Sequence, residues 1–158
     1  MFRPKANREG GSSMKNDPYV NGMFQESPFF SKSDVEGSLV LILQSRMEHR
    51  GLHLIPQPSR CVCQYQVHEF SFTDEEGAKP GAPVDRIGGI GFGEITRGGV
   101  ILVGDQVFYN DALIGTVVGF DETHMPNHYN ILLRRDRLET GRDLNMVPGG
   151  RLRFHKPE

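Results

Sequence analysis

With 158 residues, the chain is long enough for one globular domain with a single hydrophobic core and a short segment outside it. Its 18 basic and 20 acidic residues give a formal net charge of -2, which argues against a nucleic-acid partner, because proteins that bind the phosphate backbone carry a basic excess. The longest apolar run, Leu39 to Leu43, is far shorter than the roughly 20 residues of a membrane helix, so no membrane partner is expected.

The first 35 residues are polar and rich in Gly, Ser, Asn and Lys, without a sustained hydrophobic period. This composition predicts a flexible N-terminal arm over residues 1–35, followed by a single domain over residues 36–158. Phe24, Phe29 and Phe30 are unusual in a solvated tail, and we expect them to pack onto the domain or onto a neighbouring subunit.

Short β-branched and aromatic segments separated by turn residues fill the rest of the chain. The strands expected from them, in chain order, are 38–44, 64–72, 87–95, 100–103, 106–109, 113–120, 130–134 and 151–154. Pro56 and Pro58 limit pairing, so residues 46–60 are expected to form an irregular excursion or an edge segment. Because no long segment has a helical period, the pattern predicts an all-β protein, a small closed or nearly closed β-barrel of about seven to nine short strands.

Two of these strands carry further information. In 64–72, alternation places His68, Phe70 and Phe72 on one face, where a lone histidine is more often a satisfied core residue than a ligand. In 87–95, alternating glycines predict tight bending or the close approach of another backbone, as at a barrel corner.

Cys61 and Cys63 are the two cysteines of the chain. On a strand their spacing points both thiols to the same face, and a disulfide between them would be strained. The N-terminus carries basic residues without the apolar stretch of a secretory signal, so we expect a reduced, cytoplasmic protein. The alternative is a Cys-x-Cys half-site for a metal, which lacks a second cysteine pair.

The most distinctive polar segment is Asp121-Glu122-Thr123-His124-Met125-Pro126-Asn127-His128, between two predicted strands. Pro126 excludes a helix interior, so His124 and His128 are not held like the paired histidines of helical zinc-protease motifs. A loop that carries imidazoles, carboxylates and an amide on a rigid scaffold is a typical place for ligand contacts. The structural alternative is that Asp121 and Asn127 cap turns while the histidines bond to nearby backbone.

A second polar cluster is Arg46-Met47-Glu48-His49-Arg50-Gly51-Leu52-His53. Arginine beside a carboxylate and an imidazole can bind an anionic substrate through its planar guanidinium. The alternative is a solvated edge strand whose alternating charges discourage aggregation. Arg86, after a proline-rich loop, belongs to a structural ion pair with Asp85 or supplies an anion clamp.

Three functions follow if the two clusters meet in the fold. A divalent metal can take three imidazoles and a carboxylate, which leaves an open position. Alternatively, His128 and Glu48 can act as a metal-free acid/base pair on a small oxygenated substrate. In the third alternative, the polar loops of a non-catalytic subunit dock a partner enzyme.

Residues 91–154 resemble the sorbitol/glucitol-specific IIA protein of the bacterial sugar phosphotransferase system. The shared features are Gly93-Glu94-Ile95, Gly98, the Gly104-Asp105 turn position, Thr116-Val117-Val118-Gly119, Asn127-His128 before an apolar strand, and Pro148-Gly149-Gly150-Arg151-Leu152. The resemblance implies a shared barrel topology. It does not imply the family's phosphoryl transfer, because its acceptor histidine precedes the Gly-Glu position, where this chain has Ile90-Gly91-Phe92. The whole chain is also similar to a family of small bacterial proteins without an assigned function.

We therefore predict a small-molecule-binding β-barrel with acid/base chemistry of a lyase or isomerase type, and keep a non-catalytic accessory subunit as the alternative. The candidate catalytic residues are His128 as the base, His124, Glu48 and Glu122. The candidate substrate-binding residues are Arg46, His49, His53, Asn127 and Arg86. No cofactor is expected except, in the metal-binding alternative, a divalent ion at the histidine cluster; the expected partners are a small-molecule ligand and a homo-oligomer or partner enzyme.

Overall fold

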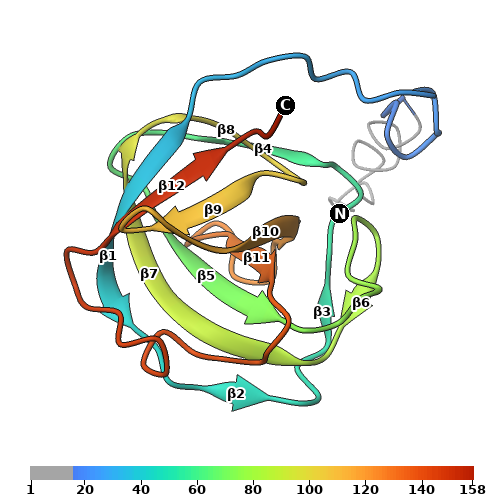
Figure 1. Ribbon diagram of the computed structural model, residues 1–158. Helices are drawn as coiled ribbons and strands as arrows, with labels where there is room; N and C mark the ends of the chain where they lie inside the picture. The colour runs from blue at the N-terminus through green and yellow to red at the C-terminus, as the bar shows by residue number, and fades with distance from the viewer. Residues whose placement is uncertain (1–15) are drawn as a thin grey trace, which may run out of the picture. The chain divides into compact units, whose positions relative to one another are not determined.

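A computed structural model describes residues 16–158 of the chain. The chain divides into two compact units, Met1–Phe30 and Ser31–Glu158. In the described part of the first unit, the ring of Tyr19 packs against those of Phe24 and Phe29, with centroid distances of 5.3 and 6.3 Å. The strands all belong to the second unit, and residues 16–158 contain no helix (Figure 1). In that part of the chain there is accordingly no helix with the length and apolar character to cross a membrane.

Seven strands of the second unit form a ring. Their order is β1 (Val35–Ile42), β12 (Arg151–His155), β9 (Gln106–Tyr109), β10 (Ala112–Asp121), β11 (Asn130–Arg134), β5 (Val67–Thr73) and β7 (Ile87–Arg97). Pairing of β1 with β7 closes the ring, and all neighbours are antiparallel except β11 and β5. This arrangement confirms the predicted all-β, nearly closed barrel.

Five short strands lie outside the ring. β2 (Arg46–Met47) pairs with β7, β3 (Leu52–His53) pairs with β6 (Pro83–Val84), and β4 (Ser59–Val62) pairs with β8 (Gly99–Leu102). Figure 1 shows β3 and β6 side by side at the flank of the ring. Short edge strands therefore make up the irregular excursion expected over residues 46–60. One of them, β3, pairs with β6, which lies in a proline-rich segment whose sequence is typical of a loop.

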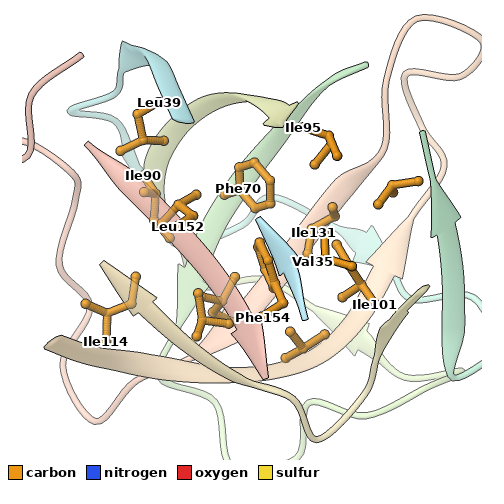
Figure 2. Packing of buried hydrophobic residues seen from close by; sticks show 14 of the residues in the cluster. Val35, Leu39, Phe70, Ile90, Ile95, Ile101, Ile114, Ile131, Leu152 and Phe154 are labelled. Atoms are coloured by element: carbon orange, nitrogen blue, oxygen red, sulfur yellow. The ribbon is translucent and has the colours of Figure 1, made fainter. Parts of the chain in front are cut away.

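The interior of the ring is filled by branched and aromatic side chains. Strand alternation sends Phe70 and Phe72 of β5 inward, where both are at most 1% exposed, together with Phe154 of β12 (Figure 2). His68, on the same face, is also buried, as expected. Because this core is packed, the interior of the ring is occupied, and the outer face of the wall and the ends of the ring are left as places for a ligand site.

A second, smaller apolar core lies on that outer surface. It contains Leu52, Leu54, Val84, Ile87, Val118 and Leu132. Leu132 of β11 points outward, whereas its neighbours Ile131 and Leu133 belong to the interior core. Residues 43–58, which we call the overlying segment, supply Leu52 and Leu54, so this core attaches the segment to the wall.

Glycines in the strands allow neighbouring parts of the chain to pack closely, as the alternating glycines of residues 87–95 predict. A Cβ at Gly88 of β7 would collide with the carbonyl oxygen of Glu139, and one at Gly119 of β10 would lie 2.7 Å from Cδ1 of Leu54. Asn110 and Asp111 adopt φ values of +45° and +69°, as a two-residue type I′ hairpin between β9 and β10 requires. A turn also forms at Gly104, with φ +96°, but the strands that it joins, β8 and β9, pair with other strands.

Candidate functional site

The two polar clusters meet on the outer wall. The amide of Ile55 donates a hydrogen bond to the carbonyl of Phe120 at 2.8 Å, and the amide of His53 donates to Oδ2 of Asp121 at 3.3 Å. Beside these contacts, Nη2 of Arg50 lies 3.4 Å from Nε2 of His124. Residues 46–53 and 121–128 are thus joined, although they are far apart in the sequence.

A cavity of about 250 Å³ opens between the overlying segment and the wall. Its lining residues are Ser45, Met47, Arg50 and Leu52 of the overlying segment, Glu69, Ser71, Ile87, Gly89 and Asn130 of the wall, and His124. Leu52 and Ile87 belong to the second core. The polar lining residues come from the overlying segment (Ser45 and Arg50), from β5 and β11, and from the loop that carries His124.

The parallel pairing of β11 with β5 creates the polar part of this wall. Asn130 lies opposite Glu69 in the register, and Leu132 lies opposite Ser71. Since successive side chains of a strand alternate between faces, these residues point outward while Phe70 and Ile131 point into the core.

Asn130 lines this cavity and carries a buried polar atom without a partner. The residue is 5% exposed, and its Nδ2 donates to Oδ1 of Asp121 at 3.0 Å. A carboxylate only accepts hydrogen bonds, so this contact fixes the amide orientation and leaves Oδ1 as the free atom. Among the described residues, Oδ1 of Asn130 has no hydrogen-bond partner. A buried acceptor left in this way favours a ligand that donates a hydrogen bond to it.

Asp121 connects strand β11, the loop that carries the histidines and the overlying segment. Besides Asn130, its carboxylate accepts hydrogen bonds from the amides of Thr123 at 2.9 Å and His53 at 3.3 Å. Burial by itself raises the pKa of Asp121, but the hydrogen bonds from Thr123, Asn130 and His53 together hold the pKa below its ordinary value. Asp121 is therefore a charged, structural anchor of the site.

Glu69, His124 and His128 form a compact group of metal-ligand type. One ligand atom from each of the three residues lies within 4.8 Å of the other two. Nε2 of His128 is 3.3 Å from Oε2 of Glu69, and the two imidazole rings are 5.1 Å apart. Asn127 contacts Nδ1 of His128 through its amide at 2.7 Å, and the ring of Phe92 packs edge-on against the imidazole of His128.

Both nitrogens of the neighbouring His68 are engaged within the protein. Its Nδ1 accepts a hydrogen bond from the amide of Tyr129 at 3.0 Å, so Nε2 carries the proton that faces Oε1 of Gln66 at 3.1 Å. Burial, and then the nearby His128, lower the pKa of His68. His68 is a neutral structural residue that supports the loop bearing His128.

The sequence analysis identified part of this site. The structure brings the predicted residues His124, His128 and Asn127 together. Glu69, Arg50 and Asn130 were not among the candidates. Alternation along 64–72 placed Glu69 on the face opposite the core, but only the long-range pairing of β5 with β11 puts it beside Asn130 and the histidine loop.

Three other candidates lie away from the cavity. Arg46 donates to the carbonyl of Leu138 at 3.2 Å and forms an ion pair with Asp143. Arg86 binds both carboxylate oxygens of Asp74, at 2.9 and 3.0 Å, and lies 3.5 Å from Glu48. The Arg86 guanidinium lowers the pKa of Asp74, as expected for an ion pair.

The remaining candidates are surface residues. Glu122 forms an ion pair with Arg60, whose guanidinium also covers the ring of Tyr129 at 4.5 Å. His49 and His53 are exposed, and His53 contributes its backbone amide to the site.

Comparison with known proteins gives a family and no function. The sequence profile of a family described as a family of unknown function (DUF6917) matches residues 29–155. No curated protein and no solved structure matches the chain. The comparisons therefore show no likeness to the phosphotransferase IIA barrel.

Proposed function

The chain belongs to the family of unknown function DUF6917, and we propose from its site that it binds a small molecule at a divalent metal ion held by Glu69, His124 and His128. The chemistry that we propose for this site is acid/base chemistry of a lyase or isomerase type. The non-catalytic accessory role has no contact in the described residues that favours it.

The observation that carries the proposal is the convergence of three ligand atoms within 4.8 Å at the edge of a cavity. Two imidazole nitrogens and one carboxylate oxygen suit Zn²⁺, Mn²⁺, Fe²⁺ or Co²⁺. Three protein ligands leave coordination positions open, which is the usual arrangement of a catalytic rather than a structural metal site. Glu69 and His124 line the cavity, so the open positions would face the bound molecule.

The surrounding residues fit this role. In the structure Nδ2 of Asn127 lies 2.7 Å from Nδ1 of His128 and donates to it. With Nε2 of His128 as the ligand atom, Nδ1 would carry the proton, and the amide of Asn127 would turn its oxygen toward Nδ1 to accept it. Such a partner fixes the orientation of a metal-binding imidazole. Phe92 holds the other side of the same ring. When bound, a divalent ion would supply Lewis-acid polarisation of an oxygen of the substrate.

Metal titration of the purified protein tests the proposal. We expect calorimetry to show that the wild type binds one equivalent of Zn²⁺ or Co²⁺. Binding should be at least about tenfold weaker in the variants that remove a ligand, His124→Ala, His128→Ala and Glu69→Gln. Asn127→Ala removes only the supporting amide and should weaken binding about 10–100-fold. His49→Ala removes an exposed imidazole next to the site and is the matched control. Binding of no metal by the wild type, or equal binding by all variants, would contradict the proposal.

A further inference from the structure

Resting on the proposed metal site, we infer that the cavity takes a short 2-hydroxy carboxylate, with Arg50 binding its carboxylate and Oδ1 of Asn130 accepting a hydrogen bond from its hydroxyl group. This inference deepens the proposed function by naming the class of ligand. It is carried by two side chains that are not metal ligands.

Arg50 supplies the positive charge. The residue is half-buried and lines the cavity, and Nη2 of its guanidinium lies 3.4 Å from Nε2 of His124. Within residues 16–158, no carboxylate forms a salt bridge with it, whereas the neighbouring Arg46 is paired with Asp143. An arginine kept free of acidic partners at the wall of a cavity is suited to the planar, two-oxygen geometry of a carboxylate.

The charge of the lining favours an anion. Glu69 is the one acidic residue among those that line the cavity, and it would be neutralised by the metal that it helps to bind. A divalent ion and Arg50 then leave the cavity with an excess of positive charge. A neutral ligand would leave that charge uncompensated in a site that is partly shielded from water.

Asn130 supplies the selectivity for a hydroxyl group. Its Oδ1 is buried and without a partner in the described part of the chain, while its Nδ2 is committed to Asp121. A ligand hydroxyl can donate to Oδ1 and still offer its oxygen to the metal. A carboxylate without the hydroxyl, or with a keto group in its place, leaves the acceptor unpaired, and sites built for a hydroxyl discriminate strongly against such analogues.

The size of the cavity limits the ligand. Its volume of about 250 Å³ is below the roughly 300–1,000 Å³ of pockets for drug-sized molecules. Met47, Leu52 and Ile87 form its apolar side, where the short carbon chain of such an acid would lie.

The test compares the binding of L-lactate, D-lactate, propionate and pyruvate to the full chain by calorimetry, both with Zn²⁺ or Co²⁺ and without metal. We expect one lactate enantiomer to bind at least about tenfold more tightly than propionate or pyruvate. With the metal at saturating concentration, Arg50→Gln should weaken lactate binding about tenfold, whereas Arg46→Gln, the matched control, should leave lactate binding unchanged. Asn130→Leu should reduce the ratio of lactate to propionate affinity to near one.

The outcomes separate the inference from the proposed function. If metal binds but lactate and propionate bind equally to the wild type, or if Arg50→Gln behaves like Arg46→Gln, the ligand class is wrong and the metal site stands. If the preference for lactate depends on Arg50 and Asn130 in the absence of any metal binding, the metal proposal is wrong and the ligand class stands. Circular dichroism of Asn130→Leu checks that this variant folds. Arg50→Lys provides a second variant, because it keeps the charge but loses the planar guanidinium. If Arg50→Lys bound lactate as tightly as the wild type does, the role of Arg50 would be overturned.

Discussion

Asp121 fixes the orientation of the Asn130 amide. Because its carboxylate accepts from Nδ2 of Asn130 at 3.0 Å, the oxygen of that amide is left for a ligand. The same carboxylate accepts the amides of Thr123 and His53, so it joins the histidine loop to the overlying segment. One buried charge thus organises two functional side chains and the segment above them.

The free energy of unfolding should depend on pH because folding lowers the pKa of Asp121. The folded pKa of Asp121 is lowered, so its contribution to stability is fully present above its ordinary pKa of 3.8 and is lost as the pH falls through the lower folded value. Asp121→Asn places an amide NH₂ against at least one of the three NH groups that donate to the carboxylate, and should lower the free energy of unfolding by about 1–3 kcal/mol at pH 7. In urea unfolding, we expect the difference between wild type and variant to narrow as the pH falls below about 4. Asp136→Asn, at an exposed position, is the control; a difference that is the same at pH 7 and pH 3 would contradict the assignment.

At the scale of single residues, the sequence identifies the histidines and misses their partners. His124, His128 and Asn127 stand out because imidazoles and an amide in one short loop are recognisable without a fold. Glu69 is one acidic residue among many on exposed strand positions, and Asn130 reads as the start of an apolar strand. Their roles depend on the pairing of β5 with β11, across about 60 residues of chain, which local pattern does not encode.

The overlying segment, residues 43–58, converts an exposed sheet face into a cavity. Leu52 and Leu54 attach it to the outer core, and β2 pairs with β7 beside the cavity. Gly119 permits this contact, because β10 has no side chain at the point where fully buried Leu54 packs. The position of Arg50 over the metal-ligand group depends on this attachment.

Gly119→Ala should loosen the overlying segment. The added Cβ would lie 2.7 Å from Cδ1 and 3.2 Å from Cβ of Leu54, so either the leucine or the strand has to move. Overpacking of this kind costs about 1–3 kcal/mol, which urea unfolding measures. Gly77→Ala is the matched control, because nothing lies within 4 Å of its added Cβ. Equal unfolding midpoints for the two variants would show that the segment is not held at Gly119.

At the scale of elements, the long strands could be predicted and the shortest could not. Residues 106–109 and 130–134 match β9 and β11, and the glycine-rich stretch becomes the long, bent β7. Their alternation and turn residues are local signals. The two-residue strands β2, β3 and β6 carry no such signal, since each exists only because its partner lies opposite in the fold.

For the whole domain, closure of the ring and the filling of its interior determine where function can reside. Seven strands surround a core of buried aromatic and branched residues, so the side chains inside the ring stabilise the fold (Figure 2). The proposed site lies outside, where alternation turns the other face of the same strands toward the overlying segment. A homo-oligomer, a partner enzyme and a cytoplasmic location stay predictions from the sequence.

The central claim is that a metal ion binds through two imidazoles and one carboxylate on this outer wall. X-ray absorption at the zinc edge, measured on the protein loaded with one equivalent of Zn²⁺, tests it most directly. We expect a shell of nitrogen and oxygen atoms at about 2.0–2.2 Å with the scattering of two imidazole rings, reduced to one ring in His128→Ala. A sulfur shell at about 2.3 Å would instead place the metal at the exposed thiols of Cys61 and Cys63, and an unchanged spectrum in His128→Ala would equally contradict the assignment.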